Sequence, residues 1–292
     1  MAQSKKKART GKGKGRRITL IVVPSILILF LAVFLTLWKA PPQKKREGQI
    51  VPPSIPAEEK KEERKGETRQ LPPPRLALII DDGGYNTAKF KEMLGMGKAL
   101  TFAILPNTPH AREFALLAHR DGSEVMLHLP MEPHEEEFYS LEKDTVLTGM
   151  SHREIQKILR NDLKQIPYVR GVNNHMGSKA TEDPKVMQAL MQALKKEKLY
   201  FIDSHTSPHT LGPEVAQRVG VATAQNDKFI DREKDVHAIK EAIRLAMKKA
   251  KKEGKVVAIG HPHPLTAQAI KEMIPEIERE GIQLVFASEV VG

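Results

Sequence analysis

The stretch LALIIDDGG, residues 76–84, contains five apolar residues followed by two aspartates and two glycines. A short, continuously apolar run is typical of a strand that is covered on both faces of a parallel sheet. Asp81 and Asp82 then stand where the strand ends. Adjacent side chains of an extended chain point to opposite faces, so one carboxylate could bind a metal ion while the other accepts a proton. An Asp before Gly can also simply shape a turn or cap a helix, and for this stretch alone both interpretations stay open.

Further apolar runs follow the first predicted strand, residues 76–82, and alternate with segments of helical periodicity. One helix is predicted after Asp183-Pro184, which is a typical helix start. The remaining predicted strands cover residues 100–105, 124–129, 172–176, 199–203, 221–224, 256–260 and 283–287. This alternation predicts an α/β fold with a buried parallel sheet.

Two α/β architectures fit seven or eight such units in residues 75–292, a closed (β/α) barrel and an open doubly wound sheet. Polar side chains stand at the carboxyl ends of five predicted strands. They are Asp81 and Asp82, His128, Asn173 to His175, Asp203 with His205, and His261 with His263. Such residues converge only if their strands encircle a common axis. We therefore predict an irregular (β/α) barrel of seven or eight strands.

The charge of the chain is unevenly distributed. The formal net charge is +11, yet residues 75–292 hold 30 basic and 30 acidic side chains. A neutral domain has no basic surplus that could follow a phosphate backbone, so we expect no nucleic-acid partner. The chain has no cysteine, which excludes disulfides, thiolate zinc sites and a cysteine nucleophile. Any metal site must use histidines and carboxylates.

Residues 18–38 form a run of 21 residues without charge. At ~1.5 Å per residue this run can cross a hydrocarbon core of about 30 Å. Residues 1–17 contain eight Lys and Arg and no acidic residue, so the positive-inside rule places this basic tail in the cytoplasm. We predict a single-pass transmembrane anchor in the cytoplasmic membrane, with the C-terminal domain in the periplasm or outside the cell. A cleaved signal peptide is the alternative, but the run is longer than the usual ~7–15 residues.

Residues 39–74 contain eight prolines and a run of mixed charge at 58–65. This composition cannot bury enough apolar surface to fold, and proline-rich segments are extended. We predict a disordered linker that separates the membrane anchor from one domain, residues 75–292.

The motif HLPME, residues 128–132, places two side chains that can bind metal four positions apart. Pro130 indicates that His128 and Glu132 lie where a strand enters a loop rather than on one face of a helix. The spacing alone is therefore a weak indication of a metal site.

Three further motifs combine apolar strands with polar ends. GVNNHMGS, residues 171–178, is a dense run of donors and acceptors, although a buried His175 satisfied by its asparagine neighbours is the alternative interpretation. FIDSH, residues 201–205, and GHPHP, residues 260–264, each follow an apolar strand with one or more imidazoles.

Taken together, five motifs resemble the divergent polysaccharide deacetylase family. They are IDDG (80–83), EVMLHLPME (124–132), NNHMGS (173–178), FIDSH (201–205) and IGHP (259–262). The resemblance covers essentially all of residues 75–292. It implies a relative of the metal-dependent carbohydrate deacetylases, whose fold is an irregular (β/α) barrel and whose members hydrolyse N- or O-acetyl groups on polymers.

The resemblance also implies a metal site. It makes Asp81 the general base and Asp82 a metal ligand. His128 matches the first of two metal-binding histidines spaced four apart, and Glu132 stands where the second would be. The third ligand is therefore either His175, on the adjacent predicted strand, or Glu132. The implied cofactor is a divalent ion, zinc above all, which lowers the pKa of a bound water molecule to about 7 in favourable sites.

The remaining polar residues complete the predicted site. His261 matches the general acid of the family, while His205 is an alternative acid or orients a neighbour. Asp203 is expected to hold an imidazole in the required tautomer. The residues expected to contact the substrate are Asn173, Asn174 and Glu132.

These expectations define two functions from different classes. The first is a membrane-anchored, extracytoplasmic, metal-dependent deacetylase that acts on an acetylated cell-envelope polysaccharide or amino sugar. The alternative is a non-catalytic carbohydrate-binding or scaffold protein of the cell envelope, which the missing second histidine of the HLPME motif favours. One tightly bound zinc ion per domain would favour the enzyme.

Overall fold

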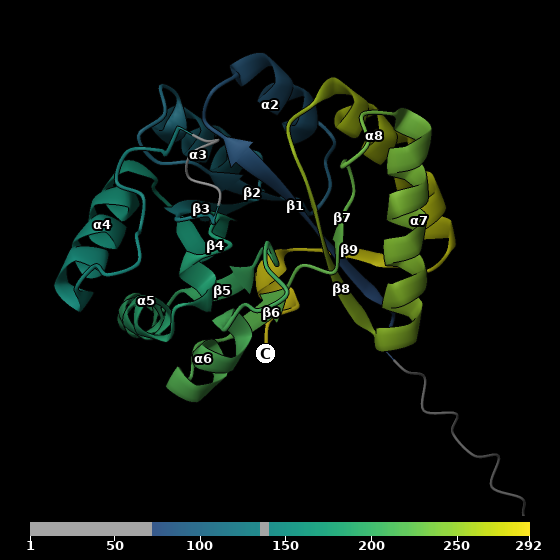
Figure 1. Cartoon of the computed structure of the whole chain (residues 1–292). Coiled ribbons are helices and arrows are strands. Elements are labelled where there is room, and N and C mark those ends of the chain that lie inside the picture. Colours follow the sequence, from purple (N-terminus) through teal and green to yellow (C-terminus); the bar gives the residue numbers. More distant parts are fainter. Residues whose placement is uncertain (1–71, 135–139) are drawn as a thin grey trace, which may run out of the picture. The chain divides into compact units, whose positions relative to one another are not determined.

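The computed structural model describes residues 72–134 and 140–292. The predicted tail and transmembrane anchor, and the linker up to residue 71, lie outside the described residues. Across the described ranges, no helix is both long and apolar enough to span a bilayer. Parallel strands alternate with helices along the described chain (Figure 1), so the prediction of an α/β fold is confirmed.

All strand pairs of the sheet are parallel. The strands are β1 (Arg75–Gly83), β2 (Thr101–Ile104), β3 (Glu124–Met131), β4 (Val169–Met176), β5 (Tyr200–Asp203), β6 (Thr223–Gln225), β7 (Lys228–Phe229), β8 (Lys255–Gly260) and β9 (Gln283–Val285). Eight of them correspond to predicted strands. The ninth, β7, has two residues and is too short to show a periodicity in the sequence.

Most strand boundaries differ from the prediction by one to three residues, and two of these differences lie next to a proline and a 3₁₀-helix. β3 continues through Pro130 to Met131 instead of ending at residue 129. Its neighbour β2 ends opposite Leu127, so the missing N–H of Pro130 removes no hydrogen bond to β2. After β9 the chain forms a short 3₁₀-helix, η3 (Ala287–Glu289), where the prediction continued the strand to residue 287.

The strand order is β6-β5-β4-β3-β2-β1-β8-β7, and β9 pairs with the first half of β1. β6 and β7 belong to one segment, which pairs with β5 at its start and with β8 at its end. Between them the Asn226 N–H donates to the Asp203 carbonyl at 2.8 Å, and the Asp227 N–H donates to the Val257 carbonyl at 2.9 Å. The sheet is therefore curled into an irregular, incomplete barrel.

Helices cover the outer face of the curled sheet (Figure 1). They are α2 (Thr87–Leu94), α3 (Ala111–Arg120), α4 (His152–Gln165), α5 (Pro184–Glu197), α6 (Gly212–Val219), α7 (Val236–Glu253) and α8 (Pro264–Arg279). α5 begins as predicted, because the Asp183 carboxylate accepts from the N–H groups of Lys185 and Val186, with Pro184 in the first turn.

The strands alternate between two apolar clusters. On β1, Leu76, Leu78 and Ile80 pack against the helices, whereas Ala77 and Ile79 belong to a smaller cluster inside the curl of the sheet. Successive side chains of a strand point to opposite faces, so each residue further along a strand points either toward the helices or toward the inside of the curled sheet. This alternation decides which polar side chains enter the site.

Candidate functional site

The candidate site lies where β1, β3 and β4 end. His128 follows Met126 on the inner face of β3, and Asn173 and His175 lie on the inner face of β4, opposite the helix-facing Val172. Asp81 continues the inner face of β1. The alternation of side chains along three parallel strands therefore places these polar side chains together at one end of the curled sheet.

Asp82 also points into the site, because a bulge in β1 interrupts the regular alternation of side chains. Two residues of β1, Asp81 and Asp82, oppose one residue of β2 in a bulge, and Asp82 has a φ of 55°. Gly84 follows with a φ of 130°, and a Cβ there would lie 2.1 Å from Thr108 Oγ1. The glycine lets the chain turn closely past this threonine, so that both carboxylates serve one site.

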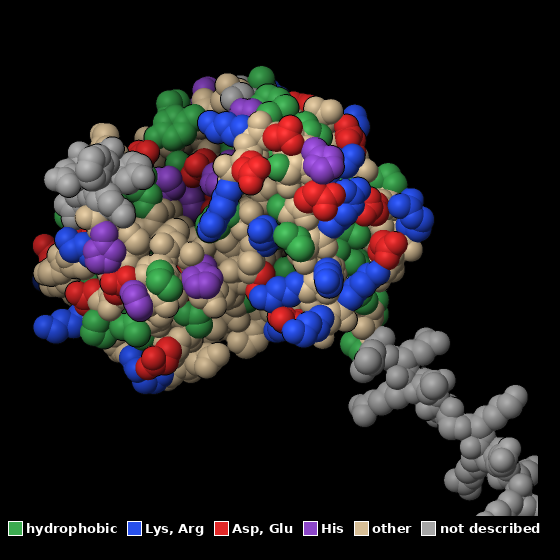
Figure 2. Space-filling model, turned by 45° about the vertical axis from the view of Figure 1, so that its right-hand side comes forward, with side chains coloured by type: hydrophobic (Ala, Val, Ile, Leu, Met, Phe, Trp, Pro, Cys, Tyr) green, Lys and Arg blue, Asp and Glu red, His purple; other side chains and the backbone are tan. Residues whose placement is uncertain are grey.

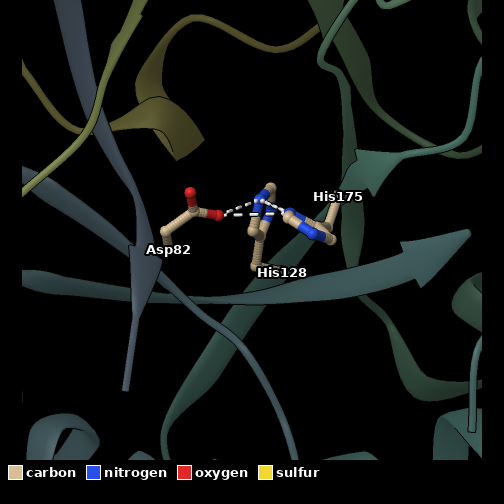
Figure 3. A group of neighbouring side chains, drawn as sticks. All are labelled: Asp82, His128 and His175. Carbon is tan, nitrogen blue, oxygen red and sulfur yellow. Dashed lines mark hydrogen bonds and ion pairs between the residues drawn. The ribbon is translucent and has the colours of Figure 1, made fainter. Parts of the chain in front are cut away.

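Three ligand-type atoms converge in the site (Figure 3). Asp82 Oδ1 lies 3.3 Å from His128 Nε2 and 3.1 Å from His175 Nδ1. The two imidazole nitrogens are 3.1 Å apart. Each atom comes from a different strand, and His128 is fully enclosed while Asp82 and His175 are partly exposed.

This arrangement fits a divalent metal ion. Asp82 Oδ1 is buried and accepts no hydrogen bond, although two imidazole nitrogens face it. Zinc binds imidazole and carboxylate ligands at about 2.0–2.2 Å, which places tetrahedral ligand atoms about 3.3–3.5 Å apart. The three observed separations are close to that spacing. Two histidines and one carboxylate would leave at least one coordination position for a water molecule or substrate.

Asn173 fixes the orientation of its neighbours. Its Nδ2 donates to Asp81 Oδ1 at 2.8 Å, and its Oδ1 lies 2.8 Å from His128 Nδ1. The amide oxygen can only accept, so it holds the hydrogen of His128 on Nδ1. Nε2 is then left with its lone pair directed toward Asp82 and His175. A partner of this kind fixes the tautomer and ring orientation of a metal-binding histidine.

The two aspartates differ in their electrostatic environment. Burial raises the pKa of Asp81 above its ordinary value, against the opposing attraction of His128 and His261. Burial acts in the same direction on Asp82, but the adjacent imidazoles of His128 and His175 outweigh it and hold the pKa of Asp82 well below its ordinary value. Asp82 is thus suited to remain a charged ligand, and Asp81 to gain and lose a proton.

His261 approaches the cluster from the end of β8, where it continues the inner face of Val257 and Ile259. Its Nδ1 lies 2.9 Å from Asp231 Oδ1, and its Nε2 lies 4.0 Å from Asp82 Oδ2. Burial lowers the pKa of His261, but the bond to Asp231 outweighs it and raises the pKa to about 9. His261 is therefore protonated at neutral pH and can donate a proton from Nε2.

The expected third-ligand alternatives are separated in space. Glu132 is buried, accepts a short hydrogen bond from the Thr148 N–H and forms an ion pair with Lys179. His175, not Glu132, lies with Asp82 and His128.

The two asparagines and Glu132 were expected to contact substrate. Asn173 is fully buried, and both ends of its amide are bonded inside the protein. Asn174 is also buried; its Oδ1 accepts from the Ser204 N–H, and its Nδ2 donates to the Met176 carbonyl. Their bonds position the site and its loops, and a direct contact with substrate stays a prediction.

Asp203 and His205 do not join the cluster. Asp203 lies on the face of β5 that Phe201 shares, and it accepts from Thr210 Oγ1 at 2.6 Å and from the His205 N–H at 2.7 Å. The described chain contains no hydrogen bond between Asp203 and an imidazole. His205 has a φ of 57° and an exposed side chain, and no hydrogen bond or ion pair links its ring to the cluster within the described residues. The tautomer-holding role expected of Asp203 is filled by Asn173 for His128 and by Asp231 for His261, because the pleat turns Asp203 toward the helices.

The sequence pattern missed Asp231 and Lys179. Asp231 follows Phe229 and Ile230, which repeats the pattern of an apolar strand ending in a carboxylate, but β7 is too short to be recognised. Lys179 lies in the turn after β4 and carries no periodic signal.

A pocket of about 300 Å³ lies beside the cluster, and Asp82 and His261 form part of its lining. In the space-filling view, histidine side chains gather around a recess, with Lys or Arg side chains at its border (Figure 2). The metal-type cluster is thus accessible to a ligand from outside.

Comparisons with known proteins agree with this fold. A family model described as divergent polysaccharide deacetylase matches residues 78–291. The uncharacterized protein YibQ of Escherichia coli K12 is 40% identical over 218 residues, covering 75% of this chain and 67% of YibQ. An uncharacterized protein of Haemophilus influenzae is 31% identical over 211 residues, covering 72% of this chain and 74% of that protein.

A solved structure also has a similar fold. It is the uncharacterized protein ATU2773 of Agrobacterium tumefaciens C58, with a TM-score of 0.73 and 20% sequence identity. The match covers 76% of this chain and 91% of that chain. The similarity extends over nearly all of the curled sheet and its helices.

Proposed function

This chain belongs to the divergent polysaccharide deacetylase family, and we propose that it is a metal-dependent hydrolase that removes acetyl groups from a carbohydrate polymer or amino sugar of the cell envelope. The observation that carries the proposal is the convergence of Asp82 Oδ1, His128 Nε2 and His175 Nδ1, with the carboxylate oxygen buried and without a hydrogen bond. A buried carboxylate oxygen that accepts no hydrogen bond is costly, and a cation bound between it and the two imidazoles would satisfy it.

The cofactor of this proposal is a divalent ion, zinc above all, held by Asp82, His128 and His175. When bound, such an ion activates a water molecule and polarises an acetyl carbonyl. Two features of the cluster suit this role, because the Asp82 carboxylate is anionic and the bond from His128 Nδ1 to Asn173 leaves Nε2 facing the cluster.

Asp81 would act as the general base. Its Oδ2 lies 3.6 Å from His128 Nε2, next to the metal-type cluster, while Oδ1 is fixed by Asn173. Burial raises the pKa of Asp81, which brings it closer to the working pH and makes it a more effective proton acceptor. The proton of the attacking water molecule would pass to this carboxylate.

His261 would act as the general acid. Asp231 holds Nδ1 of its ring, so the proton on Nε2 faces the cleft beside Asp82. The Asp231 carboxylate is itself held by the His261 N–H and by Thr266 Oγ1. On collapse of the tetrahedral species, Nε2 would donate its proton to the leaving amine or alkoxide, and acetate would be released.

We also propose that residues 18–38 anchor the chain in the cytoplasmic membrane and place the domain in the periplasm or outside the cell. The uncharged run and the basic tail before it support this topology. A phosphatase reporter fused after residue 75 should be active only outside the cytoplasm, and the chain should stay in the membrane fraction after a carbonate wash. A soluble product would indicate a cleaved signal peptide.

The proposed activity is tested by measuring acetate released from acetylated amino-sugar oligomers by the purified full-length chain, together with its zinc content. One zinc per chain and acetate release that stops when a chelator removes the metal would support the enzyme. If the chain binds no zinc after exposure to excess zinc and releases no acetate from any acetylated glycan, the result would favour a carbohydrate-binding scaffold.

A further inference from the structure

The pocket beside the cluster differs from the metal-type site in the polar groups it presents. Its volume is about 300 Å³. Its lining outside the cluster includes Asp231, Lys234, Ile239, Pro262, His263 and Thr266. Ile239 and Pro262 give it an apolar wall, which strengthens any charge interaction made against it.

Of the two carboxylates that line this pocket, Asp231 is held by hydrogen bonds and Asp82 faces the metal-type cluster. One oxygen of Asp231 bonds to the His261 ring, and the other accepts from the His261 N–H and from Thr266 Oγ1. Asp82 directs its Oδ1 at the two imidazoles of the cluster. Asp231 is therefore not available to bind the hydroxyl groups of a sugar, and Asp82 would be committed to the metal ion of the proposed function.

The donors of the pocket remain available. Lys234 lies in the segment between β7 and α7, and it forms no ion pair with any described residue. His263 caps α8, where its Nδ1 accepts from the Leu265 N–H at 3.3 Å. A neutral His263 must then carry its hydrogen on Nε2, which makes that atom a donor.

We propose that this pocket binds a carboxylate substituent of the substrate, so that the preferred substrate is an acetylated polymer that contains acidic sugars. The inference rests on the proposed deacetylase function and names the substrate class of that site. Lys234 supplies the positive charge and His263 a hydrogen bond, next to the cluster where the acetyl group would be attacked. A neutral sugar gains hydrogen bonds here but leaves the ammonium group without a counter-ion.

The test uses two matched probes and the full-length chain. The first probe is an oligosaccharide of alternating N-acetylglucosamine and glucuronic acid, and the second is the same oligosaccharide with its carboxyl groups reduced to alcohols. Calorimetry measures the affinity for each probe, and acetate release is measured separately.

Lys234→Met removes the charge and keeps most of the side-chain length, Lys234→Arg keeps the charge, and Lys248→Met is the matched control. Lys248 is an exposed lysine of α7 that lies outside the pocket and has no ion pair with a described residue.

The parent, Lys234→Arg and Lys248→Met should bind the acidic probe roughly tenfold more tightly than the reduced probe, as expected for a charge-assisted hydrogen bond. Lys234→Met should lose this preference without losing affinity for the reduced probe. The preference should also decrease as NaCl is raised from 50 to 500 mM, because salt screens the interaction.

Several results would overturn the proposal. They are equal affinity of the parent for both probes, no binding of either probe, or a preference that survives in Lys234→Met. Tight competition by free acetate that depends on Lys234 would assign the pocket to the product. Acetate release from both probes without a preference would refute the carboxylate-binding role of the pocket and leave the proposed deacetylase activity intact. A Lys234-dependent preference without acetate release would support the carboxylate-binding role and refute the deacetylase activity.

Discussion

A cluster of polar side chains lies at each end of the curled sheet. The two clusters differ in whether their buried oxygen atoms accept hydrogen bonds from the protein. At the carboxyl end lies the site cluster, which comprises Asp81, Asp82, His128, Asn173 and His175. At the amino end lies what we call the base cluster, which comprises Thr101, Glu124 and Tyr200, the first residues of β2, β3 and β5.

The base cluster is satisfied within the protein. Glu124 Oε1 accepts from Tyr200 OH at 2.7 Å, from Thr101 Oγ1 at 3.2 Å and from the Ser288 N–H at 3.1 Å. Thr101 Oγ1 in turn accepts from the Ala287 N–H at 3.0 Å. These bonds tie η3, near the C-terminus, to the start of three strands.

The site cluster contains a buried oxygen, Asp82 Oδ1, that faces two imidazole nitrogens and accepts no hydrogen bond. A buried polar network that is fully bonded stabilises a fold, whereas one that leaves an acceptor open needs a ligand to become favourable. The difference indicates that the base cluster is structural and that the site cluster binds a cation.

The largest expected effect of a single substitution is that of Asp81→Asn on turnover. The variant keeps the size and the bond to Asn173 but cannot accept a proton, so acetate release should fall on the order of 10²–10⁴-fold. Zinc content should stay at the parent level, because Asp81 is not among the three convergent ligand atoms. Asp144→Asn, an exposed aspartate outside the cluster, is the matched control. Loss of zinc in Asp81→Asn would make Asp81 a ligand instead of a base.

The next effect separates the two candidate third ligands. His175→Ala removes one of three converging atoms, so zinc affinity measured by competition with a chelator should fall at least about 10²-fold. Glu132→Gln should leave zinc affinity nearly unchanged, because Glu132 bonds to Thr148 and Lys179 away from the cluster. The reverse pattern would assign the third ligand to Glu132.

A substitution in the base cluster should change the stability of the protein but not its zinc affinity. Tyr200→Phe keeps the ring and removes the hydrogen bond to the Glu124 carboxylate, so the free energy of unfolding should fall by about 1–3 kcal/mol. Urea denaturation measures this change, and Tyr168→Phe, at an exposed tyrosine, is the control. A zinc affinity that falls in Tyr200→Phe as it does in His175→Ala would break the distinction between the two clusters.

A buried carboxylate outside both clusters, Asp162, sharpens the comparison. Both oxygens of Asp162, on α4, are buried without a hydrogen bond, as Asp82 Oδ1 is. Asp162 has no converging imidazoles within the described part of the chain, and burial together with the charge of Asp144 raises its pKa to about 8. A buried carboxyl group such as that of Asp162, which has neither a hydrogen bond nor imidazole neighbours among the described residues, therefore stays protonated at neutral pH.

The pH dependence of stability follows from this raised pKa. Between the unfolded value of 3.8 and about 8, the unfolded chain has lost the Asp162 proton and the folded chain keeps it, so Asp162 lowers stability increasingly as pH rises. Asp162→Asn removes this effect, so it should be nearly as stable as the parent at pH 4 and more stable at higher pH, by roughly 1.4 kcal/mol for each pH unit up to about pH 8. Thermal denaturation across this range, with Asp121→Asn as a control, measures the difference. A constant difference across the range would show that Asp162 does not titrate as described.

Much of the fold follows from short-range patterns in the sequence. Continuous apolar runs located eight strands, and the period of two along them also sets the directions of Asp81, His128, Asn173 and His261. The same period directs Asp203 to the helices together with Phe201, so its side chain lies away from the site.

The rest of the site depends on contacts between distant residues. The position of Asp82 requires the bulge in β1 and the close approach of Gly84 to Thr108, neither of which has a periodic signal. The partner of His261 could not be predicted, because Asp231 follows a strand of two residues that exists only through its pairing with β8.

The most direct test of the central claim is X-ray diffraction from crystals of the zinc-treated chain, measured on both sides of the zinc absorption edge. The structure predicts one strong anomalous peak at about 2.0–2.2 Å from Asp82 Oδ1, His128 Nε2 and His175 Nδ1, and none at the base cluster. The absence of a peak at the site cluster, or a peak bound by Glu132 in place of His175, would contradict the account.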